Sequence, residues 1–194
     1  MRIMLTILFI TMLTTSCKEE KTKNEEHNRS KDKVEQVEPK KKKVLSPHTS
    51  AMAMIGDAHI HIDYSSPGVR NRVIFGGLLA YNMVWQAGAH NATWLETNKD
   101  LTIDGKTLPA GKYGFFAIPS KDEWTLVFNS NWEQHGKDDY DETQDVLRFK
   151  VKPMISEEII EHLKYKVEKI NERNGTISLA WEKVAVSFPF EVIN

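Results

Sequence analysis

The chain has 194 residues, of which 40% are hydrophobic and 27% are charged, and its formal net charge at pH 7 is −1. This balance excludes a strong global field that would attract nucleic acid, so we expect no nucleic-acid partner. The length that remains after a leader and a polar linker, about 145 residues, suits one domain with a sizeable core. The single cysteine is Cys17, so that domain has no disulfide of its own.

Residues 1–17 have the pattern of a lipoprotein signal peptide. A positive start is followed by an apolar run of about eleven residues, Ile3 to Leu13, which is too short to span a bilayer. Ser16 is small and precedes Cys17, which resembles a lipobox, although Leu13 lies one place further upstream than the usual apolar residue. We therefore expect cleavage after residue 16 and a membrane anchor through acyl chains on Cys17.

Residues 18–45 are almost purely polar, which predicts a disordered linker. The segment Lys18-Glu19-Glu20 resembles the surface-export signal of Bacteroidetes lipoproteins, and it fits the start of a charged linker equally well. We expect attachment to the outer membrane, on its periplasmic or its cell-surface side. The expected division of the chain is a signal peptide over residues 1–16, a lipidated cysteine and linker over 17–47, and a β-domain over 48–194.

Short segments with period-two alternation begin after residue 50. In Ala58–Tyr64, apolar residues alternate with two histidines and an aspartate, which predicts a half-buried strand. Gly56-Asp57 before it is a turn signal, so we expect Met52–Ile55 to pair with it as a hairpin. Val73–Phe75 is a short apolar piece that ends in a turn. Further strands are expected over Ala92–Thr97, Leu101–Ile103, Lys106–Leu108, Lys112–Pro119, Trp124–Asn129 and Val146–Val151.

The segment 155–170 fits two patterns. Every fourth residue from Ile155 is apolar, as on one helix face, whereas apolar and charged residues alternate from Leu163 onward, as in a strand. The hairpin signal Asn174-Gly175 favours a strand over Leu163–Ile170, paired with a strand in which Ile177, Leu179 and Trp181 alternate. A separate last strand is expected over Val184–Val192. About nine short strands with frequent turns predict an all-β fold, namely a single antiparallel β-sandwich or jelly-roll-like domain.

Several stretches, taken in order and spacing, resemble the domain-of-unknown-function family 2911. They are Asp63–Val69, Ile74–Leu78, Val84-Trp85, Gly88-Ala89, Ala92-Thr93, Leu108–Gly114, Glu123-Trp124, Phe128-Asn129, Val146–Arg148 and Trp181–Lys183. The resemblance covers nearly all of residues 48–190. It implies a secreted or lipid-anchored β-domain and a Bacteroidetes-type host, and it implies no activity. The family usually has Gly-Ala-Asn where this chain has Gly88-Ala89-His90.

The first candidate site is a metal centre on one predicted strand. His59 and His61 project from the same strand face, and Asp63 is next on that face. Two imidazoles at this spacing reach one ion, and His90 or His135 would supply a third ligand for zinc. The same residues also fit the solvent face of an amphipathic strand, which is the interpretation we favour, so no cofactor is expected.

The second candidate site is a pocket for a sugar ring. An indole stacks on the ring, while histidine and asparagine side chains form hydrogen bonds with its hydroxyls. The candidate ligand-binding residues are Trp85, His90, Asn91, Trp132 and His135.

Tryptophans also anchor the cores of β-sandwiches, and we expect this for Trp124 and Trp181. Trp85 fits either the core or the pocket, and Trp132 lies in a polar loop. In that loop, four acidic residues offer oxygen ligands for calcium, although a solvated turn fits their spacing better. They are Asp138, Asp139, Asp141 and Glu142.

The sequence contains no Gly-x-Ser-x-Gly elbow, phosphate loop or His-Glu-x-x-His motif, which argues against an enzyme. We expect a non-enzymatic binding or assembly module, held at the membrane by lipid on Cys17, with a glycan or an envelope protein as partner. One alternative is a carbohydrate-binding or small-molecule-binding lipoprotein of an uptake system. Another is a metal-dependent hydrolase that uses His59, His61 and His90.

Overall fold

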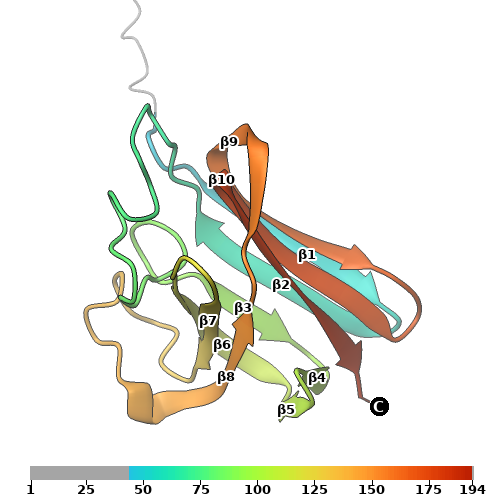
Figure 1. Cartoon of the computed structure of the whole chain (residues 1–194). Helices are drawn as coiled ribbons and strands as arrows, with labels where there is room; N and C mark the ends of the chain where they lie inside the picture. The colour runs from blue at the N-terminus through green and yellow to red at the C-terminus, as the bar shows by residue number, and fades with distance from the viewer. Residues whose placement is uncertain (1–43, 194) are drawn as a thin grey trace, which may run out of the picture. The chain divides into compact units, whose positions relative to one another are not determined.

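The computed structural model describes residues 44–193, so Cys17, the signal peptide and most of the predicted linker lie outside the described residues. Two antiparallel sheets contain all ten strands of the described chain, which confirms the all-β fold (Figure 1). The six-stranded sheet has the order β1-β2-β3-β6-β7-β8, and the four-stranded sheet has the order β5-β4-β10-β9. Within residues 44–193, no helix has the length and apolar character that crossing a bilayer requires.

The strands are β1 (His48–Ile55), β2 (Ala58–Ser65), β3 (Trp94–Thr97), β4 (Leu101–Ile103), β5 (Lys106–Leu108), β6 (Gly111–Ile118), β7 (Trp124–Asn129), β8 (Asp145–Val151), β9 (Met154–Lys169) and β10 (Asn174–Val192). A short 3-10 helix, η1 (Glu142–Gln144), precedes β8.

The β1–β2 hairpin has the predicted alternation. Ala58, Ile60 and Ile62 of β2 are buried, whereas the residues between them are partly exposed. The turn needs Gly56, because its φ is +58° and a Cβ there would lie 2.6 Å from the carbonyl oxygen of Glu172. The strands pair in register along their whole length, from Ile55 with Ala58 to His48 with Ser65.

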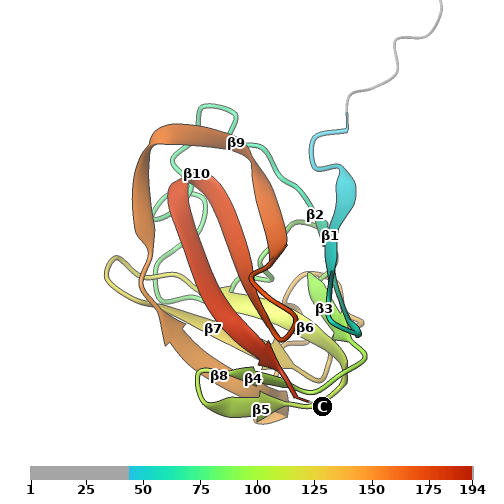
Figure 2. The same ribbon diagram turned by 90° about the vertical axis from the view of Figure 1, so that its right-hand side faces the viewer.

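The segment 155–170 is a strand, which confirms the strand pattern over the helical one. β9 begins at Met154 and pairs antiparallel with β10, and residues 170–173 form the turn between them (Figure 2). Asn174 and Gly175, predicted as the turn, are instead the first two residues of β10, and Gly175 pairs with Lys169. β10 is a single strand of 19 residues rather than two, and its register with β9 shifts on both sides of Glu182, whose φ is +57°. Such bulges let one long strand bend with its sheet.

A long loop connects β2 to β3 and contains the apolar piece Val73–Phe75. Val73 is 66% exposed, while Ile74 and Phe75 are buried in the core. Only isolated bridges form in this loop, among them Trp85 with Ala117 of β6. The segment therefore contributes side chains to the core without extending either sheet.

The main core lies between the two sheets, and its largest members are aromatic. Phe75 lies 4.9 Å from Trp124 and 6.2 Å from Trp181 between ring centroids. Trp124 and Trp181 are each 1% exposed, which confirms that both are core residues. Burying each of these indoles removes on the order of 200 Å² of surface from water, a large share of the folding free energy.

A second, smaller cluster packs on the opposite face of the six-stranded sheet. Along β6, Phe115 and Ala117 face the main core, and Phe116 points to the other face with Val127 of β7. Tyr140, from the loop between β7 and β8, covers Phe116 at 4.9 Å between ring centroids. This outer face is where the candidate site lies.

Candidate functional site

A pocket of about 400 Å³ opens beside this outer cluster. Four separate stretches of chain line it: His48 at the start of β1, residues 63–65 at the end of β2, residues 90–94 at the start of β3, and residues 132–135 in the loop after β7. The start of β1 lies beside the end of β2 because the two strands are antiparallel, with His48 opposite Ser65.

Four of the five predicted ligand-binding residues line this pocket, namely His90, Asn91, Trp132 and His135. The backbones of Asn91 and His135 form an isolated bridge, and the amide of Ala92 donates to the carbonyl of Gln134 at 3.0 Å. These contacts join two loops that lie far apart in the sequence.

Trp85, the fifth predicted residue, does not line the pocket. It is 4% exposed and stacks on Trp181 in the main core, with 5.8 Å between ring centroids. Its indole N–H donates to the carbonyl of Gly88 at 3.0 Å, so the buried nitrogen is satisfied. Of its two sequence interpretations, the structure therefore places Trp85 in the core.

Trp94 takes the place in the pocket that the sequence assigned to Trp85. It lies opposite Asp63 of β2 and Gly114 of β6 in the sheet. The ammonium group of Lys112 lies 3.6 Å from the centroid of the Trp94 ring and 3.7 Å from that of Trp132. One cation thus contacts both indoles that line the pocket, and sequence analysis missed it because Lys112 belongs to another strand.

His48 was also missed by the sequence analysis. Its Nε2 lies 2.8 Å from Oδ1 of Asp63, and the side chain of Asp63 is 19% exposed. The pairing depends on the register of β1 with β2, in which Ser50 is opposite Asp63 and His48 lies two residues before Ser50 on β1, on the same face of the sheet. Asp63, predicted as a metal ligand, therefore has a histidine partner from the neighbouring strand.

His59 and His61 lie on the same face of β2 as Asp63, as predicted, with 5.9 Å between their ring centroids. The ring of His61 meets the edge of Trp94 at 5.0 Å, and its Nε2 is buried without a hydrogen-bond partner among the described residues. In this part of the chain, no three His, Cys, Asp or Glu side chains form a group that would hold a metal ion. The zinc and calcium hypotheses stay predictions.

Gln134 is the most deeply buried polar residue of the pocket wall, at 7% exposure. Its Nε2 donates to the carbonyl of Asn131 at 2.7 Å, whereas its Oε1 has no partner among residues 44–193. An enclosed acceptor without a donor costs about 1–3 kcal/mol.

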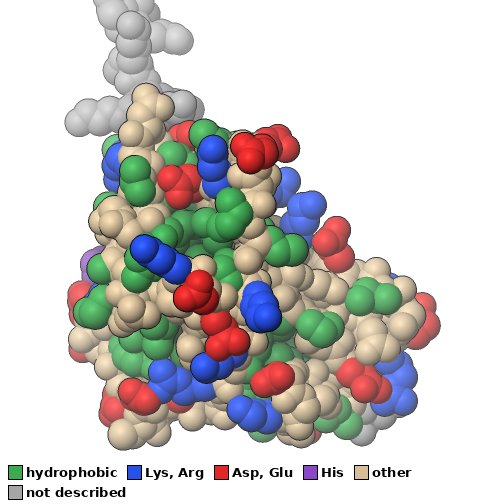
Figure 3. All heavy atoms as spheres, viewed as in Figure 1, with side chains coloured by type: hydrophobic (Ala, Val, Ile, Leu, Met, Phe, Trp, Pro, Cys, Tyr) green, Lys and Arg blue, Asp and Glu red, His purple; other side chains and the backbone are tan. Residues whose placement is uncertain are grey.

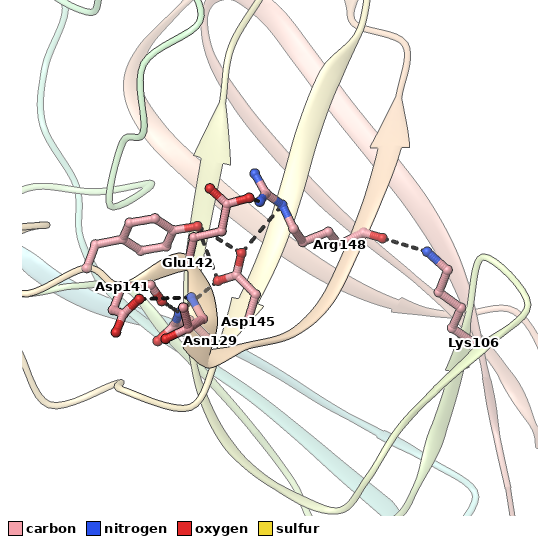
Figure 4. A network of polar contacts seen from close by, with 8 residues as sticks. Lys106, Asn129, Asp141, Glu142, Asp145 and Arg148 are labelled. Atoms are coloured by element: carbon pink, nitrogen blue, oxygen red, sulfur yellow. Dashed lines mark hydrogen bonds and ion pairs between the residues drawn. The ribbon is translucent and has the colours of Figure 1, made fainter.

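A polar network anchors the loop that includes Trp132 and Gln134 (Figure 4). The fully buried Asn129 donates from Nδ2 to Asp145 Oδ1 at 2.7 Å and to the carbonyl of Asp141 at 2.9 Å. The hydroxyl of Tyr140 donates to the same Asp145 carboxylate at 2.9 Å. Burial of Tyr140, together with this hydrogen bond, raises the pKa of its phenol.

Three of the four acidic residues considered for calcium, namely Asp138, Asp141 and Glu142, have side-chain partners within the domain. Asp141 caps η1 by accepting the amide of Thr143 at 2.9 Å, and this hydrogen bond lowers the pKa of the carboxyl. Glu142 and Asp145 form ion pairs with Arg148, and His135 lies 3.3 Å from Asp138. These contacts fit a role in shaping the loop.

On the face seen in Figure 3, basic and acidic side chains are interspersed, in line with the near-zero net charge.

A family model described as "Protein of unknown function (DUF2911)" matches residues 46–190. No curated protein and no solved structure matches the chain.

Proposed function

The chain belongs to the DUF2911 family. We propose that it is an envelope lipoprotein, anchored through Cys17, whose β-domain binds a carbohydrate without transforming it. The observation that carries the proposal is the convergence of two tryptophans with several polar side chains at one opening outside the core. Trp94 and Trp132 supply aromatic surface, and Asp63, His90 and Asn91 supply donors and acceptors beside it. This combination suits a polyhydroxylated ring, which has both apolar C–H faces and hydroxyl edges.

The size and wall of the pocket support a small polar ligand. A volume of about 400 Å³ lies within the range of roughly 300–1,000 Å³ that is common for small-molecule sites. The wall residues His90 and Asn91 are exposed, so their polar groups are accessible to a ligand that carries hydroxyls. The sequence contains none of the catalytic motifs named above, so we propose binding and not reaction.

A binding experiment tests the carbohydrate proposal. The purified domain is applied to a glycan array, and hits are measured by isothermal titration calorimetry. Trp132→Ala should weaken binding at least tenfold, because an aromatic contact buried at the centre of a site contributes roughly 2 kcal/mol or more. The control Ile170→Ser changes a side chain that is 63% exposed and does not line the pocket, so it should bind as the wild type does. Equal affinity of all three proteins for every hit would refute the proposal.

The anchor is tested separately. The proposal that Cys17 carries lipid rests on the pattern of residues 1–17. Mass spectrometry of the mature protein should find an acylated N-terminal cysteine, and Cys17→Ser should move the protein from the membrane to the soluble fraction. An unmodified Cys17 in the mature protein would contradict lipid anchoring and leave the carbohydrate proposal intact.

A further inference from the structure

We infer that the ligand carries a negative charge, as a uronate-containing oligosaccharide does, and that Lys112 selects it. This inference rests on the proposed carbohydrate site. Lys112 lies on β6 next to Trp94 of β3, and its ammonium contacts the rings of both Trp94 and Trp132. Lys112 is half-buried and does not itself line the pocket, but the two rings that its ammonium contacts do, so its positive charge lies directly beside the wall.

The charge of Lys112 has no carboxylate partner within residues 44–193. Glu96 lies directly opposite it on β3, and these two residues still form no ion pair. The indoles therefore hold the ammonium by cation–π attraction, which leaves its charge available to an incoming anion. A carboxylate that binds a partly desolvated lysine gains a charge-assisted hydrogen bond, which is roughly twice as strong as a neutral one.

Two carboxylates on the pocket wall, those of Asp63 and Glu133, would repel a negatively charged ligand only weakly. Asp63 Oδ1 is hydrogen-bonded to His48 Nε2 at 2.8 Å, so one of its two oxygens already has a partner. Glu133 forms no ion pair in the described chain, and it lies on the exposed side of the loop after β7. His90 and His135 add two imidazoles to the wall, and both are hydrogen-bond donors to a carboxylate when protonated.

The geometry also explains why a lysine occupies this position. Both indoles must hold fixed orientations to stack on a sugar, and their rings lie at 68° to each other with 6.4 Å between centroids. The ammonium attracts both rings at once and so fixes one relative to the other. Lys112 thereby combines a positioning role with the recognition of charge.

The test compares acidic with neutral ligands of one size. Calorimetry with the intact domain uses digalacturonate and trigalacturonate against the corresponding galactose oligosaccharides. The wild type should bind the acidic ligands about tenfold more tightly, and this preference should weaken as salt is raised, because exposed charges are screened.

Three substitutions test whether Lys112 is the source of the preference for acidic ligands. Lys112→Met keeps an apolar stem against the indoles and removes the charge, so it should abolish the preference and bind both ligand classes with similar affinity. Lys112→Arg, the matched control, keeps the charge and should retain most of the preference. Glu133→Gln removes an opposing charge and should strengthen binding of the acidic ligands about twofold to threefold.

The outcomes separate the two proposals. If the wild type binds neutral and acidic oligosaccharides equally well, the charge inference is wrong and the carbohydrate site stands. If it binds neither class, the carbohydrate proposal fails and the inference fails with it. A preference that survives in a folded Lys112→Met protein would assign the selectivity to another group. Should that variant not fold, equal binding of acidic ligands by the Glu133→Gln protein and the wild type would count against the inference.

Discussion

The two faces of the six-stranded sheet use tryptophan in different ways. On the inner face, Trp124 contacts Phe75, and Trp181 stacks on Trp85, with every indole at most 4% exposed. On the outer face, Trp94 and Trp132 are partly exposed, and a lysine rather than another apolar residue lies between them. The inner rings fill space between two sheets, whereas the outer rings border a pocket.

Because of this difference, we expect the inner tryptophans to determine the stability of the domain and the outer tryptophans to contribute to ligand binding. An indole enclosed by apolar neighbours contributes transfer free energy and packing to the folded state, and its loss leaves a cavity. An indole with one side open to solvent contributes less to folding and keeps surface available for a ligand. The following predictions test this separation, from the largest expected effect on stability to the smallest.

Trp124→Ala should reduce the free energy of unfolding by about 3–5 kcal/mol, because it leaves a large cavity in the main core. Urea denaturation of the purified domain, followed by circular dichroism, measures this loss. A loss below about 1 kcal/mol would mean that the inner face does not depend on its aromatic core, which would break the comparison.

Asn129→Ala should affect both regions, because Asn129 lies at the end of β7 and anchors the loop that borders the pocket. Removing a buried amide that donates to Asp145 and Asp141 should cost about 1–3 kcal/mol in unfolding experiments. Ligand binding should also weaken, since Trp132 and Gln134 lie in that loop. The control is Ser130→Ala, which removes only one exposed hydrogen bond to the carbonyl of Gln144. If the two variants unfold alike, the network of Figure 4 does not anchor the loop.

The domain should lose stability above pH 10, and a core tyrosine should account for part of this loss. Burial, followed by the nearby Tyr64, raises the pKa of Tyr165 well above its usual value, and its hydroxyl donates to the carbonyl of Ala87 at 2.7 Å. The unfolded chain releases this proton near pH 10 while the folded domain retains it. Stability is therefore complete below pH 10 and falls as the pH rises toward the folded pKa, by up to about 1.4 kcal/mol per pH unit.

Tyr165→Phe removes this group and tests its share of the alkaline loss. Unfolding curves at pH 9, 10 and 11 should show a shallower decline for the variant than for the wild type. Identical slopes for the two proteins would show that the core phenol ionises as readily in the folded state as in the unfolded one.

Trp132→Ala should change stability by less than about 1 kcal/mol, the free energy of an exposed cation–π contact. Thermal and urea unfolding measure this change, and the same protein preparation serves for the binding experiment. A destabilisation as large as that of Trp124→Ala would show that the outer tryptophans are structural, and the separation of roles would not hold.

Regular alternation made much of the fold predictable from the sequence. The pattern of Ala58–Tyr64 predicted the strand and its buried face, and Asn174-Gly175 predicted a hairpin between the last two strands, although its turn lies at residues 170–173, just before that pair. The structure of Val73–Phe75 could not be predicted in the same way, because Ile74 and Phe75 enter the core from a loop that does not pair with a strand. The full length of β10 was also missed, because bulges near Glu182 interrupt the alternation without ending the strand.

The site was only partly predictable, for reasons of register. Residues 90–91 and 132–135 were recognised because polar and aromatic side chains cluster in two loops. His48 and Lys112 belong to the site only because β1 pairs with β2 and β6 pairs with β3. Local sequence contains no information on which strands are neighbours, so contacts across strands were out of reach.

The place where β1 begins has a mechanical consequence. Any pull on the chain preceding residue 44 enters the domain at the start of β1, an edge strand of its sheet. The first backbone pair of that strand is His48 with Ser65, and both residues line the pocket. Tension on the N-terminal side therefore acts on the wall of the pocket before it reaches the hydrophobic core.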